Sequence, residues 1–103
     1  MNYSIVLTRD ADADIGLAFA WYQPIDPNLA LRFVLEGRTT MDRIAQFPFM
    51  FPLVNGSVRR ARLKRFPYAI YYSVERKEVF VTAILHKRRS DDVWRQRSRG
   101  TRE

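Results

Sequence analysis

The side chains best suited to chemistry in this sequence are basic, and they lie in its second half. Guanidinium and ammonium groups bind carboxylates and phosphates, and they can stabilise negative charge that develops in a transition state. The sequence therefore indicates recognition of an anion, with or without catalysis. The cations form two groups, Arg59, Arg60, Arg62, Lys64 and Arg65 in the first, and Lys87, Arg88 and Arg89 directly after His86 in the second.

The charge of the chain is unevenly distributed. Eighteen Lys and Arg against 11 Asp and Glu give a net charge of +7. Residues 1–57 hold four cations and six anions, net −2, whereas residues 58–103 hold 14 cations and five anions, net +9. A field of that sign attracts nucleic acid, an anionic membrane surface or an acidic protein, and composition does not choose among these partners.

Several classes of site are disfavoured by the residues present. His86 is the only histidine, and a lone histidine at the end of a strand is more often a hydrogen-bonded structural group than a catalyst. The chain has no cysteine, so a thiolate zinc site is impossible. Asp10, Asp12 and Asp14 turn to different sides of a helix, which predicts capping rather than metal binding. With four glycines and no glycine-rich phosphate loop, we expect no metal and no cofactor.

The elements that must position the cations begin with a strand and two helices. Residues 3–7 are a short β-branched run, and Thr8 with Asp10 can cap a helix over residues 10–23. The segment 24–27 carries two prolines and ends that helix. Asn28 then serves as the cap of a second helix with apolar positions through residue 45. The two form a helical hairpin.

The rest of the chain predicts strands. The stretch FPFMFPLV, residues 47–54, is interpreted as a packed loop ending at a turn-forming Asn-Gly pair. Strands over residues 57–65, 68–75 and 78–86 follow, the last two joined by a tight turn. Short links make these an antiparallel meander. The sequence thus predicts an α+β fold, a single two-layer domain over residues 1–103 in the order β-α-α-β-β-β, with an antiparallel sheet packed against the helical hairpin.

Alternation along the strands separates two faces. It places Arg60, Arg62 and Lys64 on one face of their strand as a ladder of cations, which serves either as a binding surface or as a charged edge that prevents aggregation. In the last strand it sets Phe80, Thr82, Ile84 and His86 opposite Val79, Val81, Ala83 and Leu85. At least two of the three tyrosines Tyr68, Tyr71 and Tyr72 are expected in the core.

The two ends of the chain give further expectations. The tail is rich in arginine, a short helix can start at Asp91 and Asp92, and residues 95–103 are expected to fray. Trp94 is either an anchor that closes the core or a contact to a target. The first ten residues include an acid and no long apolar run, so we expect neither a signal peptide nor a membrane span, and a cytoplasmic protein.

Two long stretches of the sequence resemble the RelE/ParE toxin superfamily. These are RFPYAIYY at residues 65–72 and VFVTAILHKRRSDDVW at residues 79–94. The likeness extends over about residues 3–97, because the opening YSIVLT strand and the acidic-capped helix also fit. The resemblance implies the toxin component of a type II toxin-antitoxin, or plasmid stabilisation, system.

The superfamily contains two kinds of toxin, and the resemblance implies different chemistry for each. RelE-like members cleave mRNA on the ribosome with Lys, Arg and Tyr side chains on the sheet, and Arg62, Lys64 and Arg88 match that pattern. The other expected Arg and Tyr fall at Ala69 and Trp94, which cannot hold a phosphate or act as a base. The sequence therefore favours a ParE-like inhibitor of DNA gyrase. A ribosome-dependent endoribonuclease that uses Arg62, Lys64, His86 and Arg88 stays the alternative.

Such a toxin implies a cognate antitoxin, and hence a hetero-oligomer. By resemblance, the antitoxin is a small DNA-binding protein whose flexible, acidic C-terminal segment wraps the toxin. A helix of that segment would bury Leu17, Trp21 and Leu35 in a groove beside the hairpin. The residues expected to bind the target or the antitoxin are Arg59, Arg60, Arg62, Lys64, Arg65, Lys87, Arg88, Arg89 and Trp94.

Overall fold

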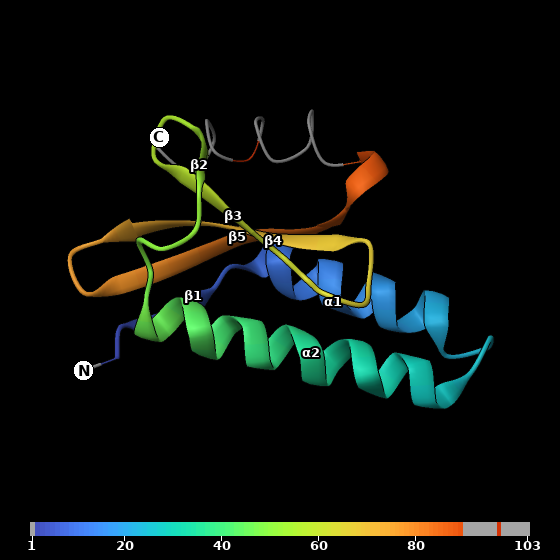
Figure 1. Cartoon of the computed structure of the whole chain (residues 1–103). Coiled ribbons are helices and arrows are strands. Elements are labelled where there is room, and N and C mark those ends of the chain that lie inside the picture. The colour runs from blue at the N-terminus through green and yellow to red at the C-terminus, as the bar shows by residue number, and fades with distance from the viewer. Residues whose placement is uncertain (1, 90–96, 98–103) are drawn as a thin grey trace.

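The computed structural model describes residues 2–89 and Arg97, and it has two helices lying on one side of a five-stranded sheet (Figure 1). This arrangement confirms the α+β fold and the order β-α-α-β-β-β, to which the structure adds one short strand. The elements are β1 Ser4–Leu7, α1 Arg9–Tyr22, α2 Pro27–Gln46, β2 Leu53–Asn55, β3 Val58–Arg62, β4 Tyr68–Glu75, β5 Glu78–His86 and the 3₁₀ helix η1 Lys87–Arg89.

The helices begin at side-chain caps. The Thr8 hydroxyl accepts a hydrogen bond from the backbone N–H of Ala11 at the start of α1, as the sequence predicts. The prediction of Asn28 as the cap of α2 is wrong. Asp26 caps this helix, because its carboxylate accepts from the Asn28 N–H and Pro27 occupies the first helical position, where no N–H is needed.

The sheet is mixed, so the expectation of a wholly antiparallel sheet is wrong. Its strand order is β1-β5-β4-β3-β2, and β1 pairs with β5 in parallel. The helical hairpin between β1 and the later strands is long enough to let the chain return in the same direction. The stretch interpreted as a packed loop also contains β2, which pairs with β3 at the opposite edge.

The core lies between the helices and the sheet. Its largest fully buried side chains include Phe33, Ile44, Ile70 and Tyr72. Tyr71 is also buried but belongs to a smaller cluster with Val58, Ala69, Ala83 and Leu85. Burial of Tyr71 and Tyr72 confirms that at least two of the three tyrosines are core residues. Because consecutive residues of a strand point to opposite faces, Tyr71 lies on the face of the sheet away from the helices, called the outer face below.

Simple alternation fails in β5. Tyr71 pairs with Ala83 but Tyr72 pairs with Val81, so Thr82 is an extra residue in the ladder, as in a β-bulge. Val79 and Val81 therefore face the helices before Thr82, whereas Ile84 does so after it. The predicted separation of odd from even residues in β5 is wrong for this reason.

The irregularity at Thr82 is held by Asp14 rather than left open. Asp14 is buried on α1, and its carboxylate accepts from the Ile84 N–H and pairs with both terminal nitrogens of Arg97. Arg97 also donates to the Thr82 carbonyl. Asp14 thus joins α1 to β5 instead of capping the helix, which corrects that part of the capping prediction. Asp10 and Asp12 do lie in the first turn.

Residues 2–89 and Arg97 contain neither a membrane-spanning helix nor a cluster of metal ligands. None of the helices there has the length and apolarity needed to cross a membrane. Nor do the described side chains gather three potential metal ligands in one place.

Candidate partner-binding surfaces

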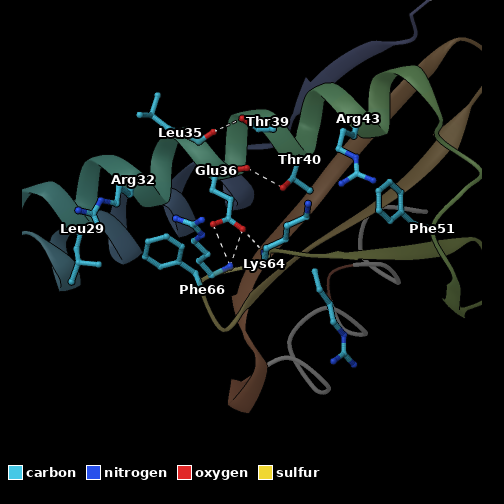
Figure 2. A pocket seen from close by; sticks show the side chains of 12 residues that line it. Leu29, Arg32, Leu35, Glu36, Thr39, Thr40, Arg43, Phe51, Lys64 and Phe66 are labelled. Carbon is cyan, nitrogen blue, oxygen red and sulfur yellow. Dashed lines mark hydrogen bonds between the residues drawn. The ribbon is translucent and has the colours of Figure 1, made fainter.

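A cationic groove runs between α2 and the chain that links β3 to β4 (Figure 2). Its volume is about 570 Å³. Its basic residues are Arg32, Arg43, Arg62, Lys64 and Arg65, and its apolar residues are Leu29, Leu35, Phe51 and Phe66. Glu36 is the one carboxylate in the lining. This surface, called the α2 groove below, combines positive charge with apolar side chains.

Glu36 shapes the α2 groove by holding the chain after β3. Its carboxylate accepts hydrogen bonds from the backbone N–H groups of Lys64 and Arg65, and Figure 2 shows it pointing from α2 toward that segment. The strand therefore ends at Arg62, three residues earlier than the sequence predicts. A three-membered ladder of Arg60, Arg62 and Lys64 is wrong, because Lys64 lies in the connection between β3 and β4.

A second cavity, of about 380 Å³, lies on the outer face of the sheet. Arg60, Arg62 and Lys87 surround it together with Tyr71 and Ala69. The Nε of Arg60 is buried and has no hydrogen-bond partner among the described residues. A buried donor without a partner usually marks a position that a ligand, ion or water completes. Arg62 lines this cavity and the α2 groove, since it ends the strand between them.

A third groove, also of about 380 Å³, lies beside α1. Leu17 and Trp21 line it from the helix, and His86 and Arg89 lie at its other side. Leu17 and Trp21 are 64% and 67% exposed, so both are free for contact. Leu35 lines the α2 groove instead. The structure thus distributes the three expected antitoxin contacts over two grooves.

The four candidate ribonuclease residues do not converge. Arg62 and Lys64 line the α2 groove, whereas His86 lines the groove beside α1. The Nδ1 of His86 accepts a hydrogen bond from the Arg88 N–H, and the imidazole packs edge-on against Tyr68. Arg88 is exposed and lines none of these three cavities.

The hydroxyls of Tyr68 and Tyr72 are poorly suited to act as a base. Burial raises the pKa of Tyr72 to about 12, although the nearby Arg59 opposes the shift. Burial also raises the pKa of Tyr68. Both phenols therefore stay protonated at neutral pH, and the Tyr72 hydroxyl donates to the Pro48 carbonyl at 2.6 Å.

The remaining predicted contacts are placed as follows. Arg59 is turned toward the segment before β2, where it donates to the carbonyls of Phe49 and Phe51. Arg65 lines the α2 groove, while Lys87, Arg88 and Arg89 form η1. Trp94, the helix expected from Asp91 and Asp92, and the tail of residues 95–103 lie outside the described residues, apart from the side chain of Arg97.

A comparison with protein families shows to which family this chain belongs. The family model for the ParE toxin of the type II toxin-antitoxin system, parDE, matches residues 5–91. The chain belongs to the ParE toxin family. The resemblance inferred from residues 65–72 and 79–94 is thereby confirmed, and the matched range contains the residues that line the α2 groove, the outer-face cavity and the groove beside α1.

A solved structure agrees with the ParE assignment. It is titled a chromosomal ParDE toxin-antitoxin system from P. aeruginosa, and it is similar to this chain with a TM-score of 0.73 and 25% sequence identity. The match covers 82% of this chain and 95% of the other. A search of curated proteins gives no significant match.

Sequence reasoning missed one exposed surface of this ParE family member. From the end of α2 to the first residue of β2, the side chains of Phe47, Phe49, Met50 and Leu53 are each more than half exposed. The apolar residues of this segment predict a packed loop, and for these four side chains that prediction is wrong. The uncharged composition of residues 47–57 gives no signal of this exposure, because the same composition predicts burial.

Proposed function

We propose that this ParE family toxin inhibits DNA gyrase in the cytoplasm, without making or breaking a bond itself. One observation carries the proposal: of the residues that the ribonuclease hypothesis needs, Arg62 and Lys64 line the α2 groove, whereas His86 lines the separate groove beside α1. Ala69, at the position where that hypothesis expects an arginine, is 5% exposed and packs in the small cluster of the outer face. Electrostatic catalysis needs its cations aimed at one reacting group.

The proposal includes a cognate antitoxin that holds the toxin inactive. Five cations against one carboxylate in the α2 groove favour an acidic segment, and the exposed Leu35 offers it an apolar contact. The similar solved structure is titled a toxin-antitoxin system, which supports a hetero-oligomer. A role in plasmid stabilisation would follow from such a pair.

A gyrase assay tests the proposal. Purified toxin is added to gyrase and relaxed plasmid, and supercoiling is measured with and without the antitoxin encoded beside the toxin gene. We expect loss of supercoiling that the antitoxin restores. Supercoiling and gyrase-DNA cleavage complexes that stay unchanged at saturating toxin would contradict the proposal.

One observation favours the alternative, a ribosome-dependent endoribonuclease. Arg60, Arg62 and Lys87 surround one cavity on the outer face, and the buried Nε of Arg60 lacks a partner among the described residues. A phosphate of mRNA would satisfy this donor. If ribosome-bound mRNA remains intact at saturating toxin, the alternative fails.

A further inference from the structure

We propose that the toxin binds its target through the segment of residues 47–53, called the aromatic loop below. The target in this proposal is a folded protein that offers an apolar cleft. This inference rests on the proposed function, because it assumes a protein target and a separate antitoxin. It assigns the two partners to different parts of the molecule.

The aromatic loop exposes a contiguous group of large apolar side chains. Phe47, Phe49, Met50 and Leu53 are 57%, 58%, 53% and 55% exposed, although they lie within seven residues. Single exposed apolar side chains are ordinary on a protein surface, whereas a contiguous group usually marks an interaction site. Phe51 is the side chain of the loop that packs against the core, whereas these four exposed side chains belong to neither core cluster.

Hydrogen bonds from β3 and β4 and a ring contact with Tyr3 hold the aromatic loop in place. Tyr72 on β4 donates its hydroxyl to the Pro48 carbonyl, and the Arg60 N–H on β3 donates to the Pro52 carbonyl at 3.0 Å. Arg59 donates to two further carbonyls of the loop, at 3.2 and 2.7 Å. The ring of Phe49 also packs edge-on against Tyr3, with centroids 6.1 Å apart.

Such anchoring reduces the entropy that a partner must remove on binding. Aromatic side chains displayed on a fixed backbone are the usual energetic centre of a protein interface, where they enter a formed pocket of the partner. A fixed loop therefore fits a folded partner better than a segment that folds only on binding.

The distribution of charge disfavours an acidic segment and a second copy of this chain as the partner of the aromatic loop. Residues 47–57 carry no charge and the rings of Phe49 and Tyr3 have one cation each beside them, whereas five cations line the α2 groove, so an acidic flexible segment gains more electrostatic energy in the α2 groove than on the loop. A second copy of this chain is also disfavoured. The guanidinium of Arg59 lies 5.2 Å from the ring centre of Phe49, and the ammonium of Lys77 lies 5.1 Å from that of Tyr3, so two facing loops would oppose like charges.

The test replaces Phe47 and Met50 by serine in the full chain. Both side chains are exposed, and the hydrogen bonds described for these two residues are made by their backbones, so the fold should persist. Leu31→Ser is the matched control, because Leu31 is 54% exposed on α2 and does not line the α2 groove. Unchanged thermal melting verifies folding of each variant.

We expect the Phe47→Ser/Met50→Ser variant to need at least about tenfold more toxin for half-inhibition of gyrase, in line with the loss of two central interface side chains. Its affinity for the antitoxin should change less than about twofold, and the Leu31→Ser variant should match the wild type in both assays. Unchanged gyrase inhibition would overturn the inference. So would a loss confined to antitoxin binding, or a loss of self-association in sedimentation.

Failure of the proposed function would be recognised separately. If the wild-type toxin does not inhibit gyrase, growth arrest on induction becomes the readout. A double variant that no longer arrests growth but still binds the antitoxin would support the loop as the contact to another target protein. One that arrests growth as the wild type does would overturn the inference.

Discussion

The α2 groove and the aromatic loop are neighbours with opposite character. Both include Phe51, and the loop continues directly from the end of α2. The groove has five basic residues and one carboxylate, whereas residues 47–57 have no charge. Charges attract a partner over about 8–10 Å at physiological salt, while apolar side chains act only on contact. The difference indicates two kinds of partner, one captured by charge and one by shape.

The largest effect should come from removing charge. Replacing Arg60, Arg62 and Lys64 together by Gln should weaken antitoxin binding by about tenfold or more at low salt, since close charge pairs across interfaces contribute about 1.5 kcal/mol or more. The affinity should also depend less on salt. Binding measured by calorimetry across a salt series checks this, and an unchanged affinity over the series would contradict it.

The structure places these cations on two surfaces, so the contribution of each surface can be measured separately. Lys64 and Arg65 line the α2 groove, whereas Arg60 lines the cavity of the outer face. The pair Lys64→Gln/Arg65→Gln should therefore lower antitoxin affinity more than Arg60→Gln alone. The reverse order would move the acidic segment to the outer face.

How far the sequence predicted these surfaces depends on the interactions involved. The strands of residues 68–75 and 78–86 and the Thr8 cap follow from local periodicity and capping, and the structure has them. The early end of β3 does not follow, because it depends on Glu36, 28 residues away in the chain. The extra residue Thr82 and the buried Asp14 depend likewise on contacts between distant elements.

For the candidate site too, the sequence predicted the residues involved but not the contacts between distant parts of the chain. Residue types identified the cations, and the family followed from two stretches of sequence. Which cations share a cavity could not be predicted, since the departure of Lys64 from the strand moves it away from Arg60. The apolar run of residues 47–54 predicted burial, yet Phe47 and Phe49 are exposed because the loop is held by backbone carbonyls rather than by its side chains alone.

A smaller effect is expected when Glu36 is replaced by Gln. The variant exchanges charge-assisted hydrogen bonds to Lys64 and Arg65 for weaker neutral ones, which should lower the free energy of unfolding by about 1–2 kcal/mol. Thermal melting checks this, and Glu75→Gln on an exposed position is the control. A melting temperature equal to that of the wild type would show that Glu36 does not hold the groove.

The smallest effect concerns the anchor of the aromatic loop. Tyr72→Phe removes the hydroxyl that donates to Pro48, which should cost about 1 kcal/mol of stability and weaken gyrase inhibition only slightly. Urea unfolding measures the change. A loss of inhibition as large as that of the Phe47→Ser/Met50→Ser variant would show that anchoring, not side-chain contact, dominates.

The raised pKa of Tyr72 predicts that the stability of the fold depends on pH. Burial raises its pKa to about 12 from 10.0, so the folded state keeps the proton to higher pH than the unfolded state. This contribution to stability is complete below pH 10 and is lost as the pH rises toward 12. Urea unfolding from pH 9 to 12 should show a decline that is smaller in the Tyr72→Phe variant, and equal declines would contradict the assignment.

The most direct test of the account is plasmid supercoiling by gyrase at increasing toxin concentration, repeated with equimolar antitoxin. If the toxin inhibits gyrase, supercoiled plasmid is progressively lost as toxin is added, and equimolar antitoxin restores supercoiling. Full supercoiling at saturating toxin, together with cleavage of ribosome-bound mRNA by the same preparation, would contradict it.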